Sequence, residues 1–169
     1  MKNPADLIDL IAVESYVIGA AFRRHGDALA GPAGQSQAHW QVIRLASSGE
    51  LTVPQIARRL GMSRQNVQRI ANDLVSEGLA HYAENPDHKS SPHLVLTAAG
   101  RAVLRTLSER ARDYRALLAR RCRGLDLARL LEQLKTLSGA LAEIDDDVAA
   151  LIPAAANPAA RSGRARRAG

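Results

Sequence analysis

The sequence predicts a mainly α protein that contains one small β-hairpin. Alanine and leucine are abundant and aromatic residues make up only 3% of the 169 positions, so the core must consist of packed helices with aliphatic side chains. Apolar residues recur at helical spacing up to about residue 150. Short strand-like segments occur only at 79–83 and 93–96, which limits the β structure to one hairpin.

Two helices are expected in the first part of the chain, over 5–29 and 35–47. The apolar face of the first helix is wide and includes Leu7, Leu10, Ile11, Val13, Val17, Ile18 and Phe22. One neighbouring helix would not cover a face of this width. The segments GPAG at 31–34 and SSG at 47–49 end the two helices, because glycine, proline and serine clusters interrupt helical structure.

Two short helices should follow, joined across a single glycine. Thr52 begins the first of them, and Gln55 stands three residues later, which is the spacing of a capping box. Ser63 is the expected cap of the second helix, which runs to about residue 77 and stops at Gly78. The hairpin comes directly afterwards, with a long polar tip between its strands.

Helices return in the last part of the chain. One is expected over about 98–122, and another begins at a cap provided by Asp126 and continues through Val148 until Pro153. Residues 153–169 contain four arginines and no apolar periodicity, so we expect a flexible basic tail there.

The two short helices have the pattern of a helix-turn-helix motif. Their inward positions are taken by Ile56, Leu60, Val67, Ile70 and Leu74. Ala57 is small where the helices must approach closely, and Gly61 occupies the turn. The hairpin that follows makes the motif a winged helix-turn-helix.

The segment PQIARRLGMSRQNVQRI, residues 54–70, contains four arginines and no acidic residue. An ordinary solvated helix face would mix in Glu and Lys. Arg, Gln and Asn are the side chains that pair with base edges in the major groove of DNA. We therefore predict that DNA is contacted by Ser63, Arg64, Gln65, Asn66, Gln68 and Arg69, although Asn66 could point inward or outward on this pattern.

The hairpin tip carries His88, Lys89 and Ser90. We predict that these residues reach the flanking minor groove or the DNA backbone. The alternative is a loop tip that is polar only because it is exposed. A net charge of +6 and a pI near 10.2 are consistent with a polyanionic partner, either nucleic acid or an anionic membrane surface.

The whole arrangement resembles the MarR family of bacterial transcription regulators. The resemblance covers residues 5 to about 150 and is carried by TVPQIARRLGMSRQNVQRIANDLVSEGL, by NPDHKSSPHLVLTAAG and by the flanking helices. Members usually carry an arginine soon after the wing aspartate, whereas this chain has Lys89 in that neighbourhood. The resemblance implies a homodimer, with dimerisation helices in 1–34 and 98–152 and a DNA-binding lobe over 35–97.

The resemblance also implies a function. A dimer of this kind reads a pseudo-palindromic operator and acts as a repressor that a small ligand releases. The implied ligand pocket lies between the dimer helices and the DNA-binding lobe, and the family's habit suggests an aromatic or phenolic acid. We assign Tyr16, His39 and Trp40 to this pocket, with core packing as the alternative, especially for Trp40.

Other classes of function have weaker support in the sequence. His81, His88 and His93 cluster in the wing but match no standard metal-ligand spacing, so we predict no metal and no cofactor, with a metal-responsive regulator of the same fold as an alternative. Cys122 stands among arginines, which leaves a redox-responsive regulator open, although a small structural residue is the simpler interpretation. No serine stands in a nucleophile-elbow or phosphate-loop context, so no catalytic residue is predicted.

Two further alternatives concern partners and location. A winged helix can also dock a protein instead of DNA, but such a domain would present an apolar or acidic outer face on its second short helix. The N-terminal segment MKNPADLIDL lacks the features of a signal peptide, and no stretch is apolar enough for a membrane span. With a single cysteine in the chain, we expect a cytoplasmic protein that does not contact a membrane.

Overall fold

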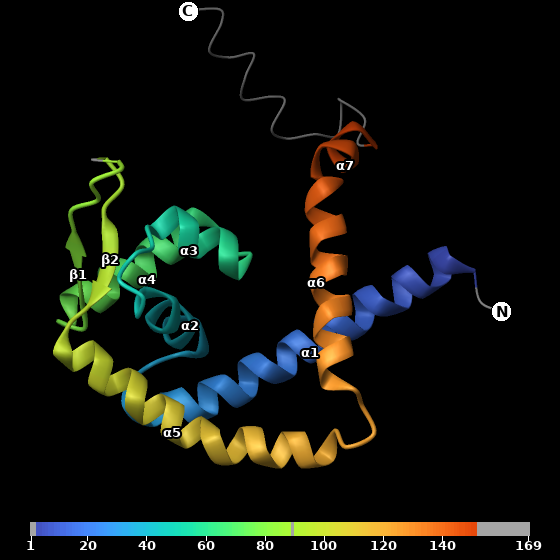
Figure 1. Ribbon diagram of the computed structural model, residues 1–169, viewed down its shortest axis with the longest axis horizontal. Helices are drawn as coiled ribbons and strands as arrows, with labels where there is room; N and C mark the ends of the chain where they lie inside the picture. Colours follow the sequence, from blue (N-terminus) through green and yellow to red (C-terminus); the bar gives the residue numbers. More distant parts are fainter. Residues whose placement is uncertain (1–2, 89, 152–169) are drawn as a thin grey trace, which may run out of the picture. The chain divides into compact units, whose positions relative to one another are not determined.

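The computed structural model describes residues 3–88 and 90–151. Its elements are α1 (Pro4–Ala30), the short 3-10 helix η1 (Gly31–Ala33), α2 (Gln37–Ala46), α3 (Val53–Leu60), α4 (Arg64–Ser76), β1 (Ala80–Ala83), β2 (His93–Leu96), α5 (Ala98–Arg121), α6 (Leu127–Glu143) and α7 (Asp145–Leu151) (Figure 1). The predicted class, mainly α with one hairpin, is confirmed. The chain divides into two compact units between Leu117 and Leu118, within α5.

The predicted helix boundaries of the helix-turn-helix are confirmed by their caps. The Thr52 hydroxyl accepts a hydrogen bond from the Gln55 N–H, and the Gln55 side chain accepts one from the Thr52 N–H at 2.8 Å, which completes the capping box. Gly61 ends α3 with a φ of 61°, in the left-handed region that glycine adopts most easily. The Ser63 hydroxyl caps α4 by accepting a hydrogen bond from the Asn66 N–H.

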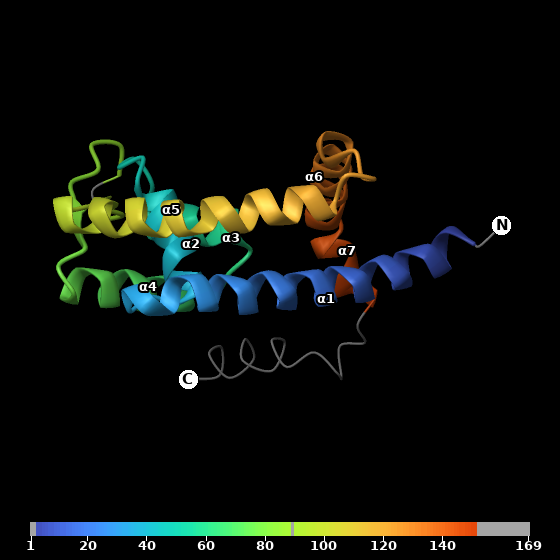
Figure 2. The same cartoon turned by 90° about the horizontal axis from the view of Figure 1, so that it is seen from below.

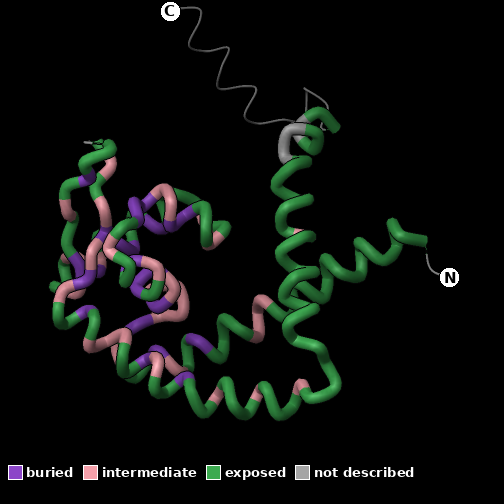
Figure 3. The backbone as a smooth tube through the Cα atoms, viewed as in Figure 1, coloured by how far each residue is buried: buried purple, intermediate pink, exposed green. Residues whose placement is uncertain are grey.

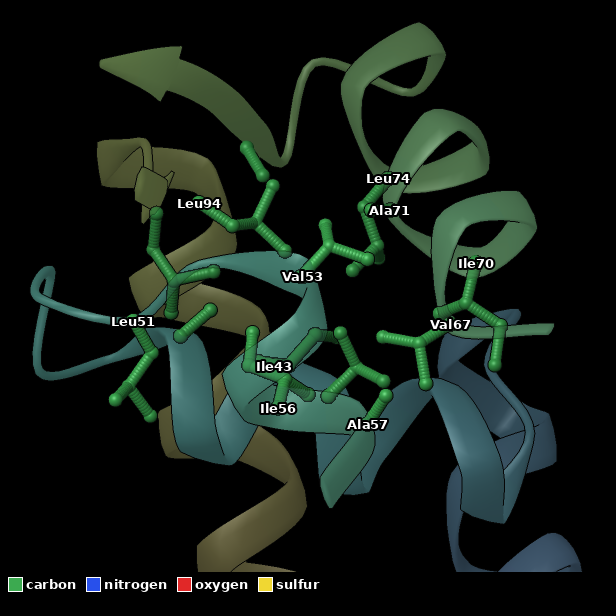
Figure 4. Packing of buried hydrophobic residues seen from close by; sticks show 14 residues of the cluster. Ile43, Leu51, Val53, Ile56, Ala57, Val67, Ile70, Ala71, Leu74 and Leu94 are labelled. Carbon is green, nitrogen blue, oxygen red and sulfur yellow. The ribbon is translucent and has the colours of Figure 1, made fainter. Parts of the chain in front are cut away.

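The main core lies between α2, α3, α4 and the hairpin. Its most deeply buried side chains include Ile43, Ile56, Val67, Ile70, Leu74, Leu94 and Leu96 (Figure 4). Figure 3 shows that buried residues are concentrated in this part of the first unit. The inward positions predicted for the two short helices are therefore confirmed, with Leu60 at the edge of the core.

The wing is an antiparallel pair in which Ala80 lies opposite Leu96 and Ala83 opposite His93. Leu94 and Leu96 point into the core, while His93 and Val95, which alternate with them, are half-buried. The Leu94 N–H also donates to the carbonyl of Leu51 at 2.9 Å, and His93 forms a bridge with Thr52. The second strand is thus joined to the segment that begins α3.

The last part of α1 packs against the part of α5 that belongs to the first unit, and Figure 2 shows the two helices running alongside each other. The Nδ1 of His25 lies 3.0 Å from the Tyr114 hydroxyl, and their rings stack edge to face. A second small core contains Ala30, Trp40, Leu107 and Ala111. Most of the apolar face of α1 remains exposed in this single chain, as the predicted width of the face required.

The second unit differs from its predicted form. A single helix was expected from Asp126 through Val148, but α6 ends at Glu143 and α7 begins at Asp145, with Ile144 outside helical geometry. The residues 145–147 are three consecutive aspartates. Aspartate is a poor residue inside a helix and a favourable one in a first turn, so the sequence favours a new helix start here.

The predicted basic tail, 153–169, lies outside the described residues, as does Lys89. The boundaries proposed for the dimerisation helices and the DNA-binding lobe stay predictions. Among the residues that the structure describes, none of the helices combines the length and apolar character that crossing a membrane requires.

Candidate nucleic-acid interface

The outer face of α4 is built by the packing of its inner face. Val67, Ile70, Ala71 and Leu74 are fully buried, which turns the intervening positions to solvent. The predicted residues Ser63, Arg64, Gln65, Asn66, Gln68 and Arg69 are all exposed. Asn66, whose direction the sequence left open, points outward, and its Oδ1 accepts a hydrogen bond from the Arg69 guanidinium at 3.3 Å.

Arg69 is also held by an acidic neighbour. Its guanidinium lies 3.1 Å from the carboxylate of Asp73, one turn further along α4. The same carboxylate lies 3.5 Å from Nε2 of His39, a residue of α2. The other ring nitrogen of His39, Nδ1, is 2.8 Å from the Ser36 hydroxyl. Asp73 therefore connects Arg69, on the outer face of α4, to His39 on α2.

A second group of contacts joins α4 to the wing. Nε2 of Gln68 donates to Oδ1 of Asn72 at 3.0 Å and to the Tyr82 hydroxyl at 2.7 Å. The Tyr82 hydroxyl donates to the same Oδ1 of Asn72 at 2.8 Å, so the three side chains form a closed triangle of hydrogen bonds. Partial burial raises the pKa of the Tyr82 phenol above 10.0, and the hydrogen bond from Gln68 offsets part of this rise.

A groove of about 1060 Å³ lies between the start of α3, the start of α4 and the wing. Arg58 and Arg64 place two guanidinium groups on its wall, while Glu50 and Asp87 add two carboxylates. A shallower hollow of about 520 Å³ covers the outer face of α4 between Arg64 and Asp73. Both surfaces are concave and contain the cationic and amide side chains that nucleic acids bind.

The wing tip is shaped by Asn85, which is buried. Its Oδ1 accepts a hydrogen bond from the Asp87 N–H at 3.0 Å, and its Nδ2 donates to the Ser91 carbonyl at 2.9 Å. This local turn holds His88 and Ser90 exposed at the tip, with Nδ1 of His88 3.1 Å from the Ser90 hydroxyl. His88 and Ser90 thus lie where the sequence predicted.

The three residues predicted for a ligand pocket lie in different environments. Trp40 is 9% exposed and packs against Ala30, Leu107 and Ala111, and its Nε1 has no hydrogen-bond partner among the described residues. His39, the residue before Trp40, is half-buried and contacts Asp73. Tyr16 is 76% exposed on α1 and does not belong to the Trp40 cluster.

Sequence reasoning missed Arg58 in the groove and three residues on or beside α4: Asn72, Asp73 and Tyr82. Asn72 and Asp73 stand four residues after Gln68 and Arg69, the spacing at which helical side chains meet, so this signal was available. The contact of Tyr82 depends on how the wing folds against α4, which no local pattern specifies. In the described ranges, no group of three or more His, Cys, Asp or Glu side chains could hold a metal ion, and Cys122 is a half-buried thiol.

Comparison with known proteins identifies the family. Residues 34–89 match the sequence profile of the MarR family. An uncharacterized protein of Mycobacterium tuberculosis (strain ATCC 25618 / H37Rv) is 49% identical over 107 residues, which span 63% of this chain and 75% of that protein. A protein of Mycobacterium bovis matches to the same extent.

Solved structures show the same fold at low sequence identity. The transcriptional regulator BldR from Sulfolobus solfataricus is similar with a TM-score of 0.68 and 16% identity, over 83% of this chain and 99% of that one. A mutant of MarR from E. coli complexed with operator DNA has a TM-score of 0.66 and 18% identity, over 80% and 99% of the two chains. CouR from Rhodococcus jostii RHA1, bound to p-coumaroyl-CoA, has a TM-score of 0.65 and 18% identity, over 79% and 93%. The profile match over the winged helix-turn-helix shows that the chain belongs to the MarR family, and the solved structures show that it has the fold of these transcriptional regulators.

Proposed function

We propose that this protein is a sequence-specific DNA-binding regulator that reads a pseudo-palindromic operator as a homodimer. The observation that carries the proposal is the outer face of α4, where Arg64, Gln65 and Gln68 are exposed near the start of a helix whose opposite face is buried. A helix of this kind enters the major groove with its N-terminal residues against base edges. Arg64 is suited to guanine, and Gln65 to adenine.

Phosphate contacts would position this helix. Arg58 and Arg64 line the groove between α4 and the wing, where the DNA backbone between the major and minor grooves would pass. His88 and Ser90 at the wing tip, with Lys89 between them in the sequence, would then reach the adjacent minor groove or its phosphates. Such contacts add affinity for every sequence and leave specificity to α4.

The apolar surface of the chain supports a homodimer. On α1, the exposed side chains include Leu7, Ile8, Leu10, Ile11, Val17, Ile18 and Phe22. On α6 and α7, they include Leu130, Leu131, Leu134, Leu141, Val148 and Leu151. Patches of this extent on a monomeric protein are rare, and covering them with a second copy of the chain would remove them from water.

The experiment is a binding titration against duplexes selected from a random pool. We expect one preferred site with two half-sites about one helical turn apart. We also expect affinity to fall steeply between about 50 and 200 mM salt because phosphate binding releases counterions. A protein that selects no duplex, and whose weak DNA binding is insensitive to salt, would favour the alternative in which this winged helix docks a protein partner.

We further propose that the protein is a repressor released by a small aromatic or phenolic ligand, acting in the cytoplasm. Among the described residues, Nε1 of Trp40 has no hydrogen-bond partner and offers a donor to such a ligand, and the contact between His39 and Asp73 connects α2 to α4. Tyr16 is the third candidate residue for this pocket. CouR, which shares the fold, was crystallised with a coumaroyl thioester, so the fold can accommodate an aromatic acid derivative.

A panel of phenolic and other hydrophobic compounds tests the ligand proposal. An effector should raise the melting temperature and release the operator, and operator DNA must in turn weaken that ligand by the same factor. The coupling needed is about 1–3 kcal/mol, or 5- to 150-fold. A compound that stabilises the protein without changing operator affinity would show that its pocket does not control DNA binding.

A further inference from the structure

The triangle of Gln68, Asn72 and Tyr82 restricts what the recognition helix can offer to a base. An amide NH2 group has two N–H donors, and Nε2 of Gln68 lies within hydrogen-bond distance of two acceptors, Oδ1 of Asn72 and the Tyr82 hydroxyl, which together can occupy both. The single proton of the Tyr82 hydroxyl is donated to Asn72. Among the described residues, Oε1 of Gln68 has no hydrogen-bond partner, so the carbonyl oxygen is the group left for DNA.

This restriction changes the base that Gln68 can recognise. A free glutamine binds adenine through two hydrogen bonds, accepting from N6 and donating to N7. A glutamine whose donors are occupied keeps only the accepting half of this contact. It can then accept from the amino group of adenine or from that of cytosine, and it has nothing to offer guanine O6 or thymine O4.

We propose that Tyr82, a residue of the wing, is a specificity-determining residue: by occupying an amide donor of Gln68, it makes the recognition helix select an amino-bearing base, adenine or cytosine, in place of adenine alone. This inference rests on the proposed DNA-binding function. Tyr82 acts as a positioning residue, since it fixes the orientation of Gln68 without itself contacting a base.

The location of Tyr82 explains why it can have this role. It belongs to β1 and lies opposite Leu94 of β2, so its backbone is held by the wing rather than by α4. Gln68 is thus constrained from outside its own helix. A side chain fixed before binding loses less conformational entropy on contact with the base. This favours the contact in which Oε1 of Gln68 accepts a hydrogen bond from a base amino group.

The test compares Tyr82→Phe, which removes only the hydroxyl, with the wild-type protein. A preferred duplex is first selected with the wild type, and the base pair read by Gln68 is identified as the one whose preference Gln68→Ala abolishes. Affinities are then measured by fluorescence anisotropy for all four bases at that position. We expect the wild type to bind adenine and cytosine there within about threefold of each other, and Tyr82→Phe to favour adenine by about tenfold, because a released N–H can reach N7.

Three controls separate this effect from unrelated ones. Asn72→Ala, which frees the other donor, should shift the preference in the same direction. Tyr82→Phe should have no effect on base preference in a Gln68→Ala background. Tyr114→Phe, which removes a hydroxyl that contacts His25 on α1, should leave the wild-type preference unchanged, and circular dichroism should show that every variant is folded.

The outcomes distinguish the inference from the function on which it rests. If the wild type selects a site and Tyr82→Phe selects the same bases with the same ratios, Tyr82 does not determine specificity, while DNA binding stands. If a folded wild-type protein selects no duplex at all, the proposed function is overturned and the inference with it.

Discussion

Gly100, in the first turn of α5, lies so close to Leu79 that a Cβ atom at position 100 would overlap the carbonyl oxygen of Leu79. That oxygen also accepts a hydrogen bond from the Thr97 N–H at 3.0 Å. The Thr97 hydroxyl donates to the Gly78 carbonyl at 2.8 Å and accepts from the Gly100 N–H at 3.1 Å. The start of α5 is therefore held by close packing and hydrogen bonds against the turn that follows α4.

The first prediction follows from this close approach. Gly100→Ala should reduce the free energy of unfolding by about 1–3 kcal/mol, because the backbone of Leu79 must shift to admit a methyl group. Gly139→Ala on α6 is the matched control: a Cβ there meets no heavy atom of the described residues within 4 Å. Alanine at that position should stabilise the protein by about 0.5–1 kcal/mol through helix propensity alone. Urea denaturation at one protein concentration measures both, and equal stabilities for the two variants would contradict the packing described.

The second prediction concerns DNA affinity. Arg64→Ala should weaken binding to the selected operator by about 1–3 kcal/mol, or roughly 5- to 150-fold, and relax the preference at one base position in each half-site. The control is Arg110→Ala, which removes an equal charge from an exposed position on α5. Anisotropy titrations with operator and random duplexes compare the two. If Arg64→Ala left both affinities at wild-type values, the proposed orientation of α4 would be wrong.

The third prediction concerns the homodimer. Leu134 is 47% exposed on α6 in the single chain, and a dimer interface there would bury it in two copies. Leu134→Lys should raise the dissociation constant at least about 100-fold, since burying each leucine contributes about 1.5–3 kcal/mol. Gln133→Lys adds the same charge at the preceding position, on the face that also carries Arg129 and Thr136, and should leave the dimer intact. Sedimentation equilibrium measures both, and a dimer of Leu134→Lys as tight as wild type would place the interface elsewhere.

The fourth prediction concerns pH. The pKa of Tyr82 is raised above 10.0, so the folded state holds this proton more tightly than the unfolded state does. The buried neutral phenol therefore contributes its full stability below pH 10.0, and this contribution is lost as the pH rises through the folded-state pKa, because burial disfavours the phenolate. The difference in phenolate absorbance between wild type and Tyr82→Phe isolates this group from the other tyrosines. Ionisation below 10.0 in the folded protein would contradict the environment described.

The sequence predicted those parts of the structure that depend on local chemistry. Thr52, Gln55 and Ser63 cap their helices where capping patterns indicate, because these bonds join residues only three positions apart. The buried face of α4 follows equally from helical periodicity. The end of α6 was missed, because the leucine pattern continues across Ile144 and outweighed the weaker signal of the three aspartates.

The candidate site was predicted only in part, for a physical reason. Periodicity identifies which residues of α4 face outward, but it does not show what holds them. The contacts of Asp73 with His39 and of Gln68 with Tyr82 join residues 34 and 14 positions apart, and they exist only after α2 and the wing have packed around α4. Base preference depends on these contacts. The sequence alone therefore predicts DNA binding well, but it does not predict equally well which bases are selected.

The joining of β2 to the segment before α3 has a consequence for the operator. Because Leu94 is hydrogen-bonded to Leu51 and His93 is paired with Thr52, the wing cannot swing independently of the helices that it follows. Within each half-site, the distance between the bases contacted by α4 and those reached by the wing should then be constant. One base pair inserted between the major-groove contacts and the flanking minor-groove contacts would carry the second set out of reach. Tolerance for variable spacing can come only from between the two protomers, so we expect natural operators to vary at their centre and to keep the length of each arm constant.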